Sequence, residues 1–510
     1  MPVQMLFQEA KRCGVSKLAL TEINNVASYL DMLRICDENK PQPNGRTRYD
    51  QEPFTLNLAV GVEFRNEKES GTFEFIALAR NNEGFEEITR FLSYHNREAK
   101  RFPARAPFFR QVFVIYPFGK FEPDRLLAHE YIGVKKTGLP ALMLHPLRES
   151  HASKFIAHHP VTLLPPEKVR DVKTKKEKLS HRDHNIHRLL RCIARNTLLS
   201  KLPEHEQASR DEYMLPPHLL TAEFGSFSQL VTQTQQLLDQ CSIECAPGED
   251  KNKKSFTASP DEDSAFLRSE TEKGYAKRYG TDRSIWNSHI EKELTIIHKK
   301  RFTAYYLIAY DLIQFAQKQG YDFVGRGSGA NSTVAYCLGI TNVDPIELDL
   351  YFERFLNEER VSPPDFDIDF SWDNRDAVYN YLFHRYGHDH VCLLGTHVTY
   401  QAKSILRELG KVFGLPKEEI DSLVENRKEK PERDHLTTQI THYAQHILNR
   451  ELPAYISIHA GGVLITEKSI YAYTATELPP KGLPVSQFEM HAAEDFGIYK
   501  FDILSQRGLG

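Results

Sequence analysis

Nine residues, 362–370, constrain most strongly what this chain folds into. Their sequence, SPPDFDIDF, alternates three aspartates with three large apolar side chains. In a β-strand, residues two apart share a face, so Asp365, Asp367 and Asp369 point one way and their apolar neighbours the other. Carboxylates so placed lie roughly 6–7 Å apart at Cα, close enough to bridge two Mg²⁺ ions about 3.5–4 Å apart. Because clustered negative charge is costly unless cations neutralise it, the pattern favours a metal site over a solvated strand face.

Length and composition indicate a multidomain intracellular protein. A chain of 510 residues predicts two to four domains. No run of about eighteen apolar residues predicts a membrane span, and the first residues do not resemble a secretory signal. The closest of the seven cysteines, Cys241 and Cys245, have no second pair to complete a zinc site. Free thiols and a cytoplasmic location are therefore expected. With a net charge of −4, any nucleic-acid surface must be local.

The first 205 residues alternate between helix and strand patterns. An amphipathic helix is predicted over 4–13, and strands over 17–20, 56–64, 73–79 and 112–116. This alternation is typical of an α/β layer fold.

The next elements include two polar stretches. The charged segment 167–182 predicts a solvated loop, and 247–263 predicts a linker. Continuous helix is predicted over 285–319, followed by a strand over 321–324. Residues 401–450 are again helical in pattern, and 460–504 return to strands.

A glycine-rich turn, GRGSGANS at 325–332, is the second chemical feature. Alternate glycines let backbone N–H groups turn toward an anion, and the helix predicted over 333–338 adds a favourable dipole. Arg326 supplies a positive charge and Ser328 a hydroxyl. The spacing matches neither the dinucleotide fingerprint nor the P-loop. Some forty residues before the acidic strand, it favours a cradle for a triphosphate.

A third feature lies near the end of the chain. In 498–504, IYKFDIL, alternation places Lys500 and Asp502 on one face. The carboxylate of Asp502 could complete a metal site with Asp365 and Asp367, and the ammonium of Lys500 could steady a phosphate or a primer terminus. As an isolated strand this segment is unremarkable; its interest lies in the combination.

The run 325–370 closely resembles the palm of C-family bacterial DNA polymerases, the DNA polymerase III alpha subunits and their shorter error-prone relatives. It reads GRGSGANSTVAYCLGITNVDPIELDLYFERFLNEERVSPPDFDIDF. The resemblance continues in the same order through five later blocks, so it covers roughly residues 265–510. These blocks are LGT at 394–396, AK…RE at 402–408, HAGGV at 459–463, VSQF at 485–488 and KFD at 500–502. Residues 1–205 resemble, less closely, the polymerase and histidinol phosphatase (PHP) domain of this family.

The resemblance implies a role for each matching residue. It implies that Asp365, Asp367 and Asp502 bind two Mg²⁺ ions and are catalytic, and that Asp369 is a supporting carboxylate. It places Gly327 and Ser328 on the triphosphate turn, and His459 at the junction of thumb and palm. The candidate phosphate contacts are Arg326, Lys403, Arg407 and Lys500.

In the PHP-like region the chain departs from the family. The opening strand with its metal-binding histidines is absent, and Thr21-Glu22-Ile23 replaces the usual Thr-Asp-His. The remnants of a metal cluster are Glu63, His159, Asp183 and His187. Four scattered ligands rarely hold a trinuclear site, so we expect no PHP metal, no PHP nuclease or pyrophosphatase activity, and a structural role.

The expected fold class is multidomain α/β and α+β: a PHP-like distorted α/β barrel, then a polymerase beta-like nucleotidyltransferase palm with an inserted helical thumb. The expected domains are a truncated PHP domain at 1–205, a connecting segment at 206–264, palm at 265–400 and 458–510, and thumb at 401–457.

The expected function is DNA-directed DNA synthesis from dNTPs on primer–template DNA in the bacterial cytoplasm. Because the family continues into fingers and a clamp-binding segment, we expect this chain to be a fragment that is inactive alone. Sliding clamp and replisome contacts would then belong to the missing regions. Three alternatives stay open: a PHP-type phosphoesterase, a different nucleotidyltransferase, or a non-catalytic paralogue that binds DNA or a replisome partner.

Overall fold

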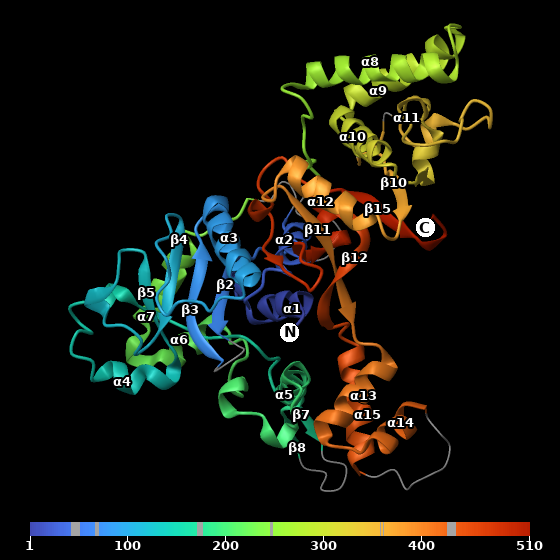
Figure 1. The fold of residues 1–510 in the computed structure, drawn as a ribbon. Helices are drawn as coiled ribbons and strands as arrows, with labels where there is room; N and C mark the ends of the chain where they lie inside the picture. The colour runs from blue at the N-terminus through green and yellow to red at the C-terminus, as the bar shows by residue number, and fades with distance from the viewer. Residues whose placement is uncertain are drawn as a thin grey trace. The chain divides into compact units, whose positions relative to one another are not determined.

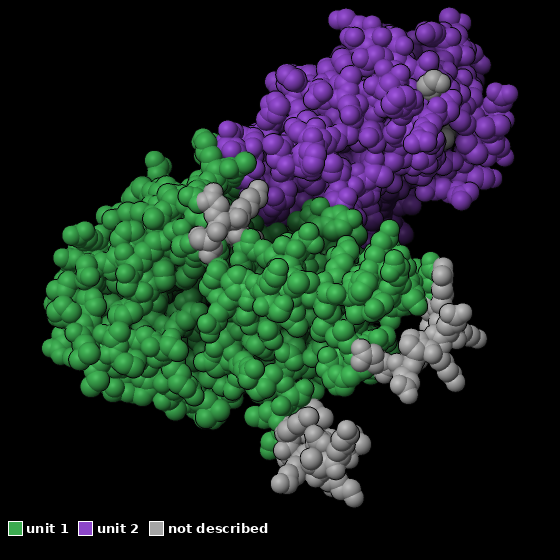
Figure 2. All heavy atoms as spheres, turned by 60° about the horizontal axis from the view of Figure 1, so that its bottom comes forward, with its two compact units in different colours: residues 1–95, 99–244, 397–456 green, residues 96–98, 245–396, 457–510 purple. Residues whose placement is uncertain are grey.

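The computed structural model describes residues 1–41, 52–66, 71–170, 177–244, 248–357, 359–360, 362–425 and 435–509. The chain divides into two compact units, coloured separately in Figure 2. Unit 1 comprises residues 1–95, 99–244 and 397–456, and unit 2 comprises 96–98, 245–396 and 457–510. Among the described residues, no helix is both long and apolar enough to cross a membrane.

Unit 1 is built on a six-stranded sheet in the order β1-β2-β3-β4-β5-β6. The β2–β3 and β3–β4 pairs are antiparallel and the other three are parallel. A distorted α/β barrel was expected, but in the described residues the sheet is open, with β1 and β6 as its edge strands. The strands are β1 (Lys17–Ile23), β2 (Asn57–Asn66), β3 (Thr72–Ala79), β4 (Val112–Pro117), β5 (Glu130–Val134) and β6 (Phe155–Ala157).

Helices lie against this sheet (Figure 1), and their apolar side chains pack on its strands. They include α6 and α7, which lie in the range expected to be a connecting segment yet carry the buried Phe224, Leu230 and Val231 against β5 and β6. The helices of the sheet domain are α1 (Val3–Cys13), α2 (Tyr29–Glu38), α3 (Asn82–Glu98), α4 (Leu139–Met143), α5 (Arg182–Arg195), α6 (Pro217–Phe224) and α7 (Gln229–Leu238).

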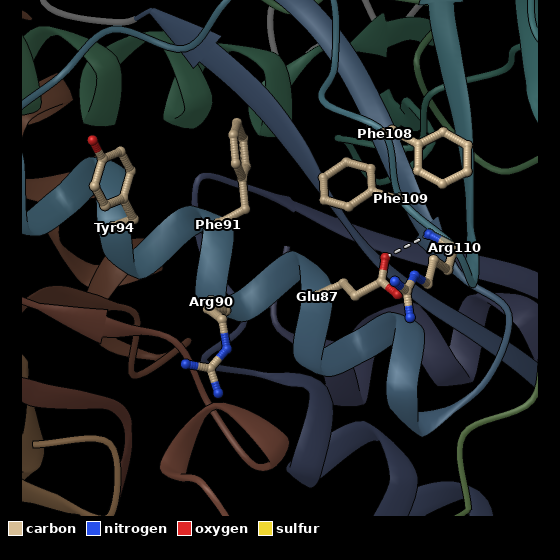
Figure 3. Close-up of a pocket in the computed structure, with 7 residues that line it drawn as sticks. All are labelled: Glu87, Arg90, Phe91, Tyr94, Phe108, Phe109 and Arg110. Carbon is tan, nitrogen blue, oxygen red and sulfur yellow. Dashed lines mark hydrogen bonds between the residues drawn. The ribbon is translucent and has the colours of Figure 1, made fainter. Parts of the chain in front are cut away.

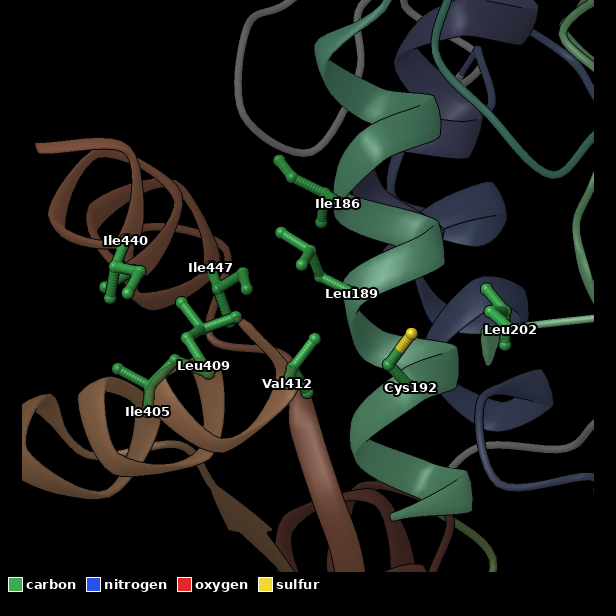
Figure 4. Close-up of a cluster of buried hydrophobic side chains, with 10 residues drawn as sticks. Ile186, Leu189, Cys192, Leu202, Ile405, Leu409, Val412, Ile440 and Ile447 are labelled. Carbon is green, nitrogen blue, oxygen red and sulfur yellow. The ribbon is translucent and has the colours of Figure 1, made fainter. Parts of the chain in front are cut away.

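Three further helices of unit 1 come from the segment expected to be the thumb: α13 (Ala402–Phe413), α14 (Lys417–Glu425) and α15 (His435–Leu448). Helix α13 begins at a capping box, in which the side chains of Gln401 and Ser404 bond each other's backbone N–H. Its apolar face packs with α15 against α5, and Figure 4 shows this shared cluster. Ile186, Leu189, Leu409 and Ile447 are each at most 2% exposed there. Burial of apolar area therefore fixes these three helices to α5.

The segment expected to be a solvated loop, 167–182, contains regular structure instead. Strands β7 (Glu167–Arg170) and β8 (Glu177–Ser180) pair antiparallel. The prediction missed them because charged side chains dominate the segment, whereas backbone hydrogen bonds hold a two-stranded ribbon whatever the side-chain polarity. Residues 171–176 lie outside the described part.

Unit 2 has a seven-stranded sheet in the order β13-β14-β11-β12-β15-β10-β9. Its central strands combine pieces of chain far apart in sequence, because β10 pairs with β15 in parallel and with β9 in antiparallel. The strands are β9 (Phe323–Arg326), β10 (Asp367–Ser371), β11 (Val391–Thr399), β12 (Pro453–Ile465), β13 (Thr476–Glu477), β14 (Val485–Glu489) and β15 (Lys500–Gln506).

The helices of unit 2 differ from the prediction in one respect. The continuous helix expected over 285–319 is broken into a π-helix (Trp286–Ile290), α9 (Glu291–Lys299) and α10 (Thr303–Gln319). The chain turns at Arg301, whose φ is +60°, a backbone conformation that no helix accommodates. Apolar periodicity alone does not register such a break. The remaining helices are α8 (Pro260–Arg278), α11 (Thr333–Leu338), α12 (Arg375–Tyr386) and α16 (Met490–Asp495).

The expected linker at 247–263 is also partly ordered structure. Asn252 is 3% exposed and forms an antiparallel bridge with Thr466. Its side chain bonds both backbone groups of Tyr499, donating to the carbonyl at 2.6 Å and accepting from the N–H at 2.7 Å. Composition predicted a linker because polar side chains dominate the segment. The side-chain amide of Asn252, however, makes the two hydrogen bonds that a neighbouring strand would make with the residue before β15.

Candidate metal centre

Three aspartates from two segments meet in unit 2. The parallel register of β10 and β15 sets Asp367 beside Asp502, and Asp365 lies two residues before β10 begins. One carboxylate oxygen from each lies within 4.8 Å of the other two. Among the described residues this is the one group of three or more acidic, histidine or cysteine side chains so arranged. The expected continuous strand 362–370 is therefore shorter, yet its first two aspartates still reach Asp502.

The electrostatics of the group suit a bound cation. Burial raises the pKa of Asp367, and the charges of Asp365 and Asp502 raise it further. Burial also raises the pKa of Asp365, with Asp502 adding to the shift and Lys500 opposing it. Asp502 is 6% exposed, and its Oδ1 atom is buried without a hydrogen-bond partner. An orphaned buried carboxylate oxygen beside two crowded carboxylates fits the oxygen-ligand set of a divalent metal ion.

Two positively charged side chains, Lys500 and Arg326, contact the aspartates. Lys500 forms an ion pair with Asp502. Burial works against the charge of Lys500, but the hydrogen bond that the ammonium donates to Asp502, together with the nearby carboxylate charges, outweighs burial and raises the pKa of the ammonium. Arg326 of β9, paired opposite Asp367 of β10, lies 3.6 Å from that carboxylate and 2.7 Å from Asp369. The hydrogen bond to Asp369 raises the pKa of the guanidinium.

Asp369 is held differently from the three grouped aspartates. Its Oδ2 atom accepts from Arg326 Nε and, at 3.2 Å, from Gln506 Nε2. It is 4% exposed and is not a member of the three-carboxylate group. Its Oδ1 atom, like that of Asp502, is buried without a hydrogen-bond partner, so Asp369 differs from the group in its bonds to Arg326 and Gln506 and in lying outside the three-carboxylate cluster.

The glycine turn lies directly against the carboxylates. Gly327 has φ +76°, and a Cβ at this position would lie 2.7 Å from Asp367 Oδ2. Glycine is therefore required both by the backbone conformation and by the close approach. Gly327 and Ser328 are exposed beside Asp367, where their backbone groups can face a ligand.

The helix behind this turn does not offer its N-terminus to a ligand, contrary to the expectation from sequence. Glu293 of α9 is fully buried and accepts from Ser332 Oγ and from the N–H groups of Thr333 and Val334. Ser332 Oγ in turn accepts from the N–H of Ala335. Burial raises the pKa of Glu293 to about 7, against the effect of those hydrogen bonds. The first amides of α11 are already satisfied within the protein.

Other side chains position the site without showing a sequence motif. Tyr305 donates to the carbonyl of Lys500 at 2.6 Å and stacks on Phe501 with ring centroids 4.1 Å apart. Arg360 donates to the carbonyls of Phe355, Ser362 and Pro363, so it shapes the loop that delivers Asp365. The only signals in the sequence were a tyrosine in an apolar helix and an arginine in a loop, which are too common to single out.

Of the remaining predicted residues of the polymerase region, two lie in unit 1 and His459 lies beside β15 in unit 2. Lys403 and Arg407 are on α13 of unit 1, and Arg407 pairs with Asp421 at 3.3 Å. His459 Nδ1 accepts from the N–H of Gly462, the residue opposite Asp502 in β12, at 2.9 Å. Burial lowers the pKa of His459, in keeping with a neutral imidazole at this position.

The four PHP residues each bond to protein groups. Glu63 pairs with Arg65, and His159 Nε2 contacts the carbonyl of Tyr213 at 2.8 Å. Asp183 accepts from the N–H of Leu164 and pairs with Arg450. His187 Nε2 accepts from the N–H of Ala208 at 3.2 Å, and burial lowers its pKa to about 4. In the described residues these four do not form a group that could share an ion.

Comparisons with known proteins agree with this architecture. The model for the bacterial DNA polymerase III alpha NTPase domain matches residues 265–505, and that for the PHP domain matches 1–116. The chain thus carries a PHP-type region followed by a region of the DNA polymerase III alpha type. Both domain matches confirm the resemblance stated from sequence.

Two of the curated relatives match along nearly the whole chain, and a third matches a shorter part of it. The error-prone DNA polymerase of Symbiobacterium thermophilum is 28% identical over 98% of this chain and 49% of its own length. DNA polymerase III subunit alpha of Bacillus subtilis is 27% identical over 99% of this chain and 47% of its own length. That of Ureaplasma parvum is 36% identical, over 45% of this chain and 25% of its own. The chain thus spans about half the length of the first curated relatives.

Proposed function

We propose that unit 2 holds the nucleotidyl-transfer centre of a DNA-directed DNA polymerase, acting on dNTPs and primer–template DNA. The observation that carries the proposal is the meeting of Asp365, Asp367 and Asp502 beneath a glycine turn. In this assignment, 265–400 and 458–510 form the palm, 401–457 the thumb and 1–205 the PHP domain.

The carboxylates of Asp365, Asp367 and Asp502 would hold two Mg²⁺ ions. When bound, such ions activate an attacking hydroxyl and stabilise the charge of a leaving pyrophosphate. Lys500 then exchanges its pairing with Asp502 for a phosphate oxygen. The separation of Asp369 from the group supports a positioning role, in which it aims Arg326 toward the triphosphate.

The turn binds the triphosphate through its own backbone N–H groups and Arg326. Glu293 already occupies the amides of α11, so the helix dipole contributes little. Lys403 and Arg407, exposed on α13, would contact DNA phosphates and so make binding sensitive to salt.

A PHP-type phosphoesterase is the weaker candidate, because Glu63, His159, Asp183 and His187 are each bonded to protein groups. Clamp and replisome contacts remain proposals, since the relatives extend over about twice the matched length.

The test is Mn²⁺ binding, followed by electron paramagnetic resonance, together with templated primer extension. Both are measured on this chain and on the longest protein that its gene encodes. We expect Mn²⁺ to bind, with Asp367→Asn abolishing binding while the circular dichroism spectrum is unchanged. Unchanged Mn²⁺ affinity in Asp367→Asn and Asp502→Asn would overturn the assignment even if extension were observed.

A further inference from the structure

A second surface, in unit 1, has the composition of a ligand site. A cavity of about 570 Å³ opens between α3 and the segment that precedes β4. Its walls carry four aromatic rings, two arginines (Arg90 of α3 and Arg110 of the preceding segment) and one glutamate of α3. Figure 3 shows the rings of Tyr94, Phe91 and Phe109 in a row along one side of α3, with Phe108 and Arg110 beyond them.

The walls of this cavity are held in place by packing. Phe109 is 4% exposed and meets Phe91 edge to face, with ring centroids 5.7 Å apart. Glu87 accepts from the backbone N–H of Arg110 at 2.7 Å and so ties the segment to α3. Phe108, which directly precedes these two anchors in the chain, is nevertheless 73% exposed, and Tyr94 is 40% exposed. Large rings presented on an ordered frame are typical of a contact surface.

The segment that forms one wall of the cavity is basic. The segment 99–110, AKRFPARAPFFR, contains four basic residues and no acidic residue, in a chain whose net charge is −4. All four basic side chains are exposed. Arg105 reaches the buried carboxylate of Glu130 and so serves the fold. Lys100 lies over the ring of Tyr94, 4.7 Å from its centroid, so a cation already accompanies one of the exposed rings.

We propose that this surface binds single-stranded nucleic acid. Bases would stack on Phe108 and Tyr94, and phosphates would contact Lys100, Arg101 and Arg110. Exposed aromatic rings flanked by basic side chains are the general arrangement for single-strand binding. A duplex hides its base faces, so the rings select an unpaired strand. Glu87, the acidic wall residue, opposes a phosphate beside it, which places the backbone of the strand toward the basic segment instead.

This site is independent of the metal centre, which lies in unit 2. The test is fluorescence anisotropy of a labelled oligodeoxythymidylate with the 510-residue chain, in the absence of divalent metal. Phe108→Ala should weaken binding about tenfold. Arg110→Gln should reduce the slope of log affinity against log salt by about 1. The matched control, Met143→Ala with Lys136→Gln, removes an exposed apolar and an exposed basic side chain elsewhere in unit 1 and should change neither quantity.

Photocrosslinking locates the strand on the wild-type chain without relying on a variant. An oligonucleotide carrying iodinated deoxyuridine should form adducts with the peptide that contains Phe108, and Asp367→Asn should leave their yield unchanged. Adducts confined to unit 2, or an affinity that Phe108→Ala and Tyr94→Ala both leave unaltered, would overturn the proposal and point to a protein partner. Neither outcome bears on the metal centre, so the two proposals fail separately.

Discussion

Acidic side chains in the two units are used in opposite ways. In unit 2, Asp365, Asp367 and Asp502 converge, and a buried oxygen of Asp502 has no hydrogen-bond partner. In unit 1, Asp183 is bonded to a backbone N–H and to Arg450, and Glu206 is paired with both Arg191 and Arg195.

The comparison teaches how a carboxylate available to a ligand differs from a structural one. A carboxylate satisfied by arginine stabilises the fold and has little capacity left for a cation. Carboxylates that are crowded together and have raised pKa values are stabilised in their charged form when a cation binds. Such perturbed groups are common at functional sites. Residue type alone does not separate these cases, because both units offer aspartates.

The largest effect is expected from the aspartates of unit 2. Asp502→Asn should lower metal-dependent nucleotidyl transfer about a thousandfold or more, because it removes a ligand of the proposed metal site. Asp183→Asn should leave the turnover number within about threefold, since Asp183 serves structure. The measurement is single-nucleotide extension by the longest natural form of the protein. Equal losses of activity in the two variants would contradict the distinction between ligand-binding aspartates in unit 2 and structural aspartates in unit 1.

The next largest effect is expected from breaking the ion pair of Asp183 with Arg450. Their side chains are 12% and 10% exposed, so removing one partner leaves a nearly buried charge, and Arg450→Met should destabilise unit 1 by about 3 kcal/mol. The measurement is urea unfolding, followed by hydrogen exchange of α5. The double variant with Asp183→Leu should recover part of the loss. A recovery of zero would mean that the pair is not coupled.

Two buried glutamates should respond to pH with opposite sign. The pKa of Glu293 is raised to about 7, so the folded state binds its proton more tightly, and its contribution to stability falls as pH rises from about 4.5 to 7. The pKa of Glu206 is lowered: burial opposes the shift, but Arg191 and Arg195 prevail. Its contribution is therefore present above its ordinary pKa and lost in acid.

Unfolding free energies measured from pH 5 to 8 test this contrast. Glu293→Gln should remove a pH-dependent loss on the order of 3 kcal/mol, and Glu206→Gln should remove stability throughout the same window. A pH-dependent difference between wild type and Glu206→Gln within this window, or a pH-independent difference for Glu293→Gln, would contradict the assigned environments.

The smallest effect is expected at the glycine turn. Gly327→Ala should cost roughly 1–2 kcal/mol of stability through its positive φ, and should also weaken Mn²⁺ binding because the new Cβ meets Asp367. Gly482→Ala is the matched control: its φ is +78° but nothing lies within 4 Å of its Cβ. It should show the backbone cost alone. Equal Mn²⁺ affinities in the two variants would show that the glycine turn does not influence metal binding.

Much of the fold followed from periodicity. The first helix and the first strands of unit 1 were predicted to within a few residues, because each has a clear amphipathic or alternating pattern. The break at Arg301, the ribbon β7–β8 and the anchoring of Asn252 were missed. Each of these three features depends on backbone geometry or on a distant partner. Such causes leave no local pattern in the sequence.

By itself, the sequence determined which side chains carry charge next to apolar strand residues, and it identified Asp365, Asp367 and Asp502 as a set. Only the tertiary structure decided that β10 and β15 are parallel neighbours, with Asp367 opposite Asp502. It also decided that Glu293, far from any motif, occupies the amides of α11. Alternation along one strand is local, whereas the pairing of β10 with β15 and the contact of Glu293 with α11 join segments that lie far apart in the sequence.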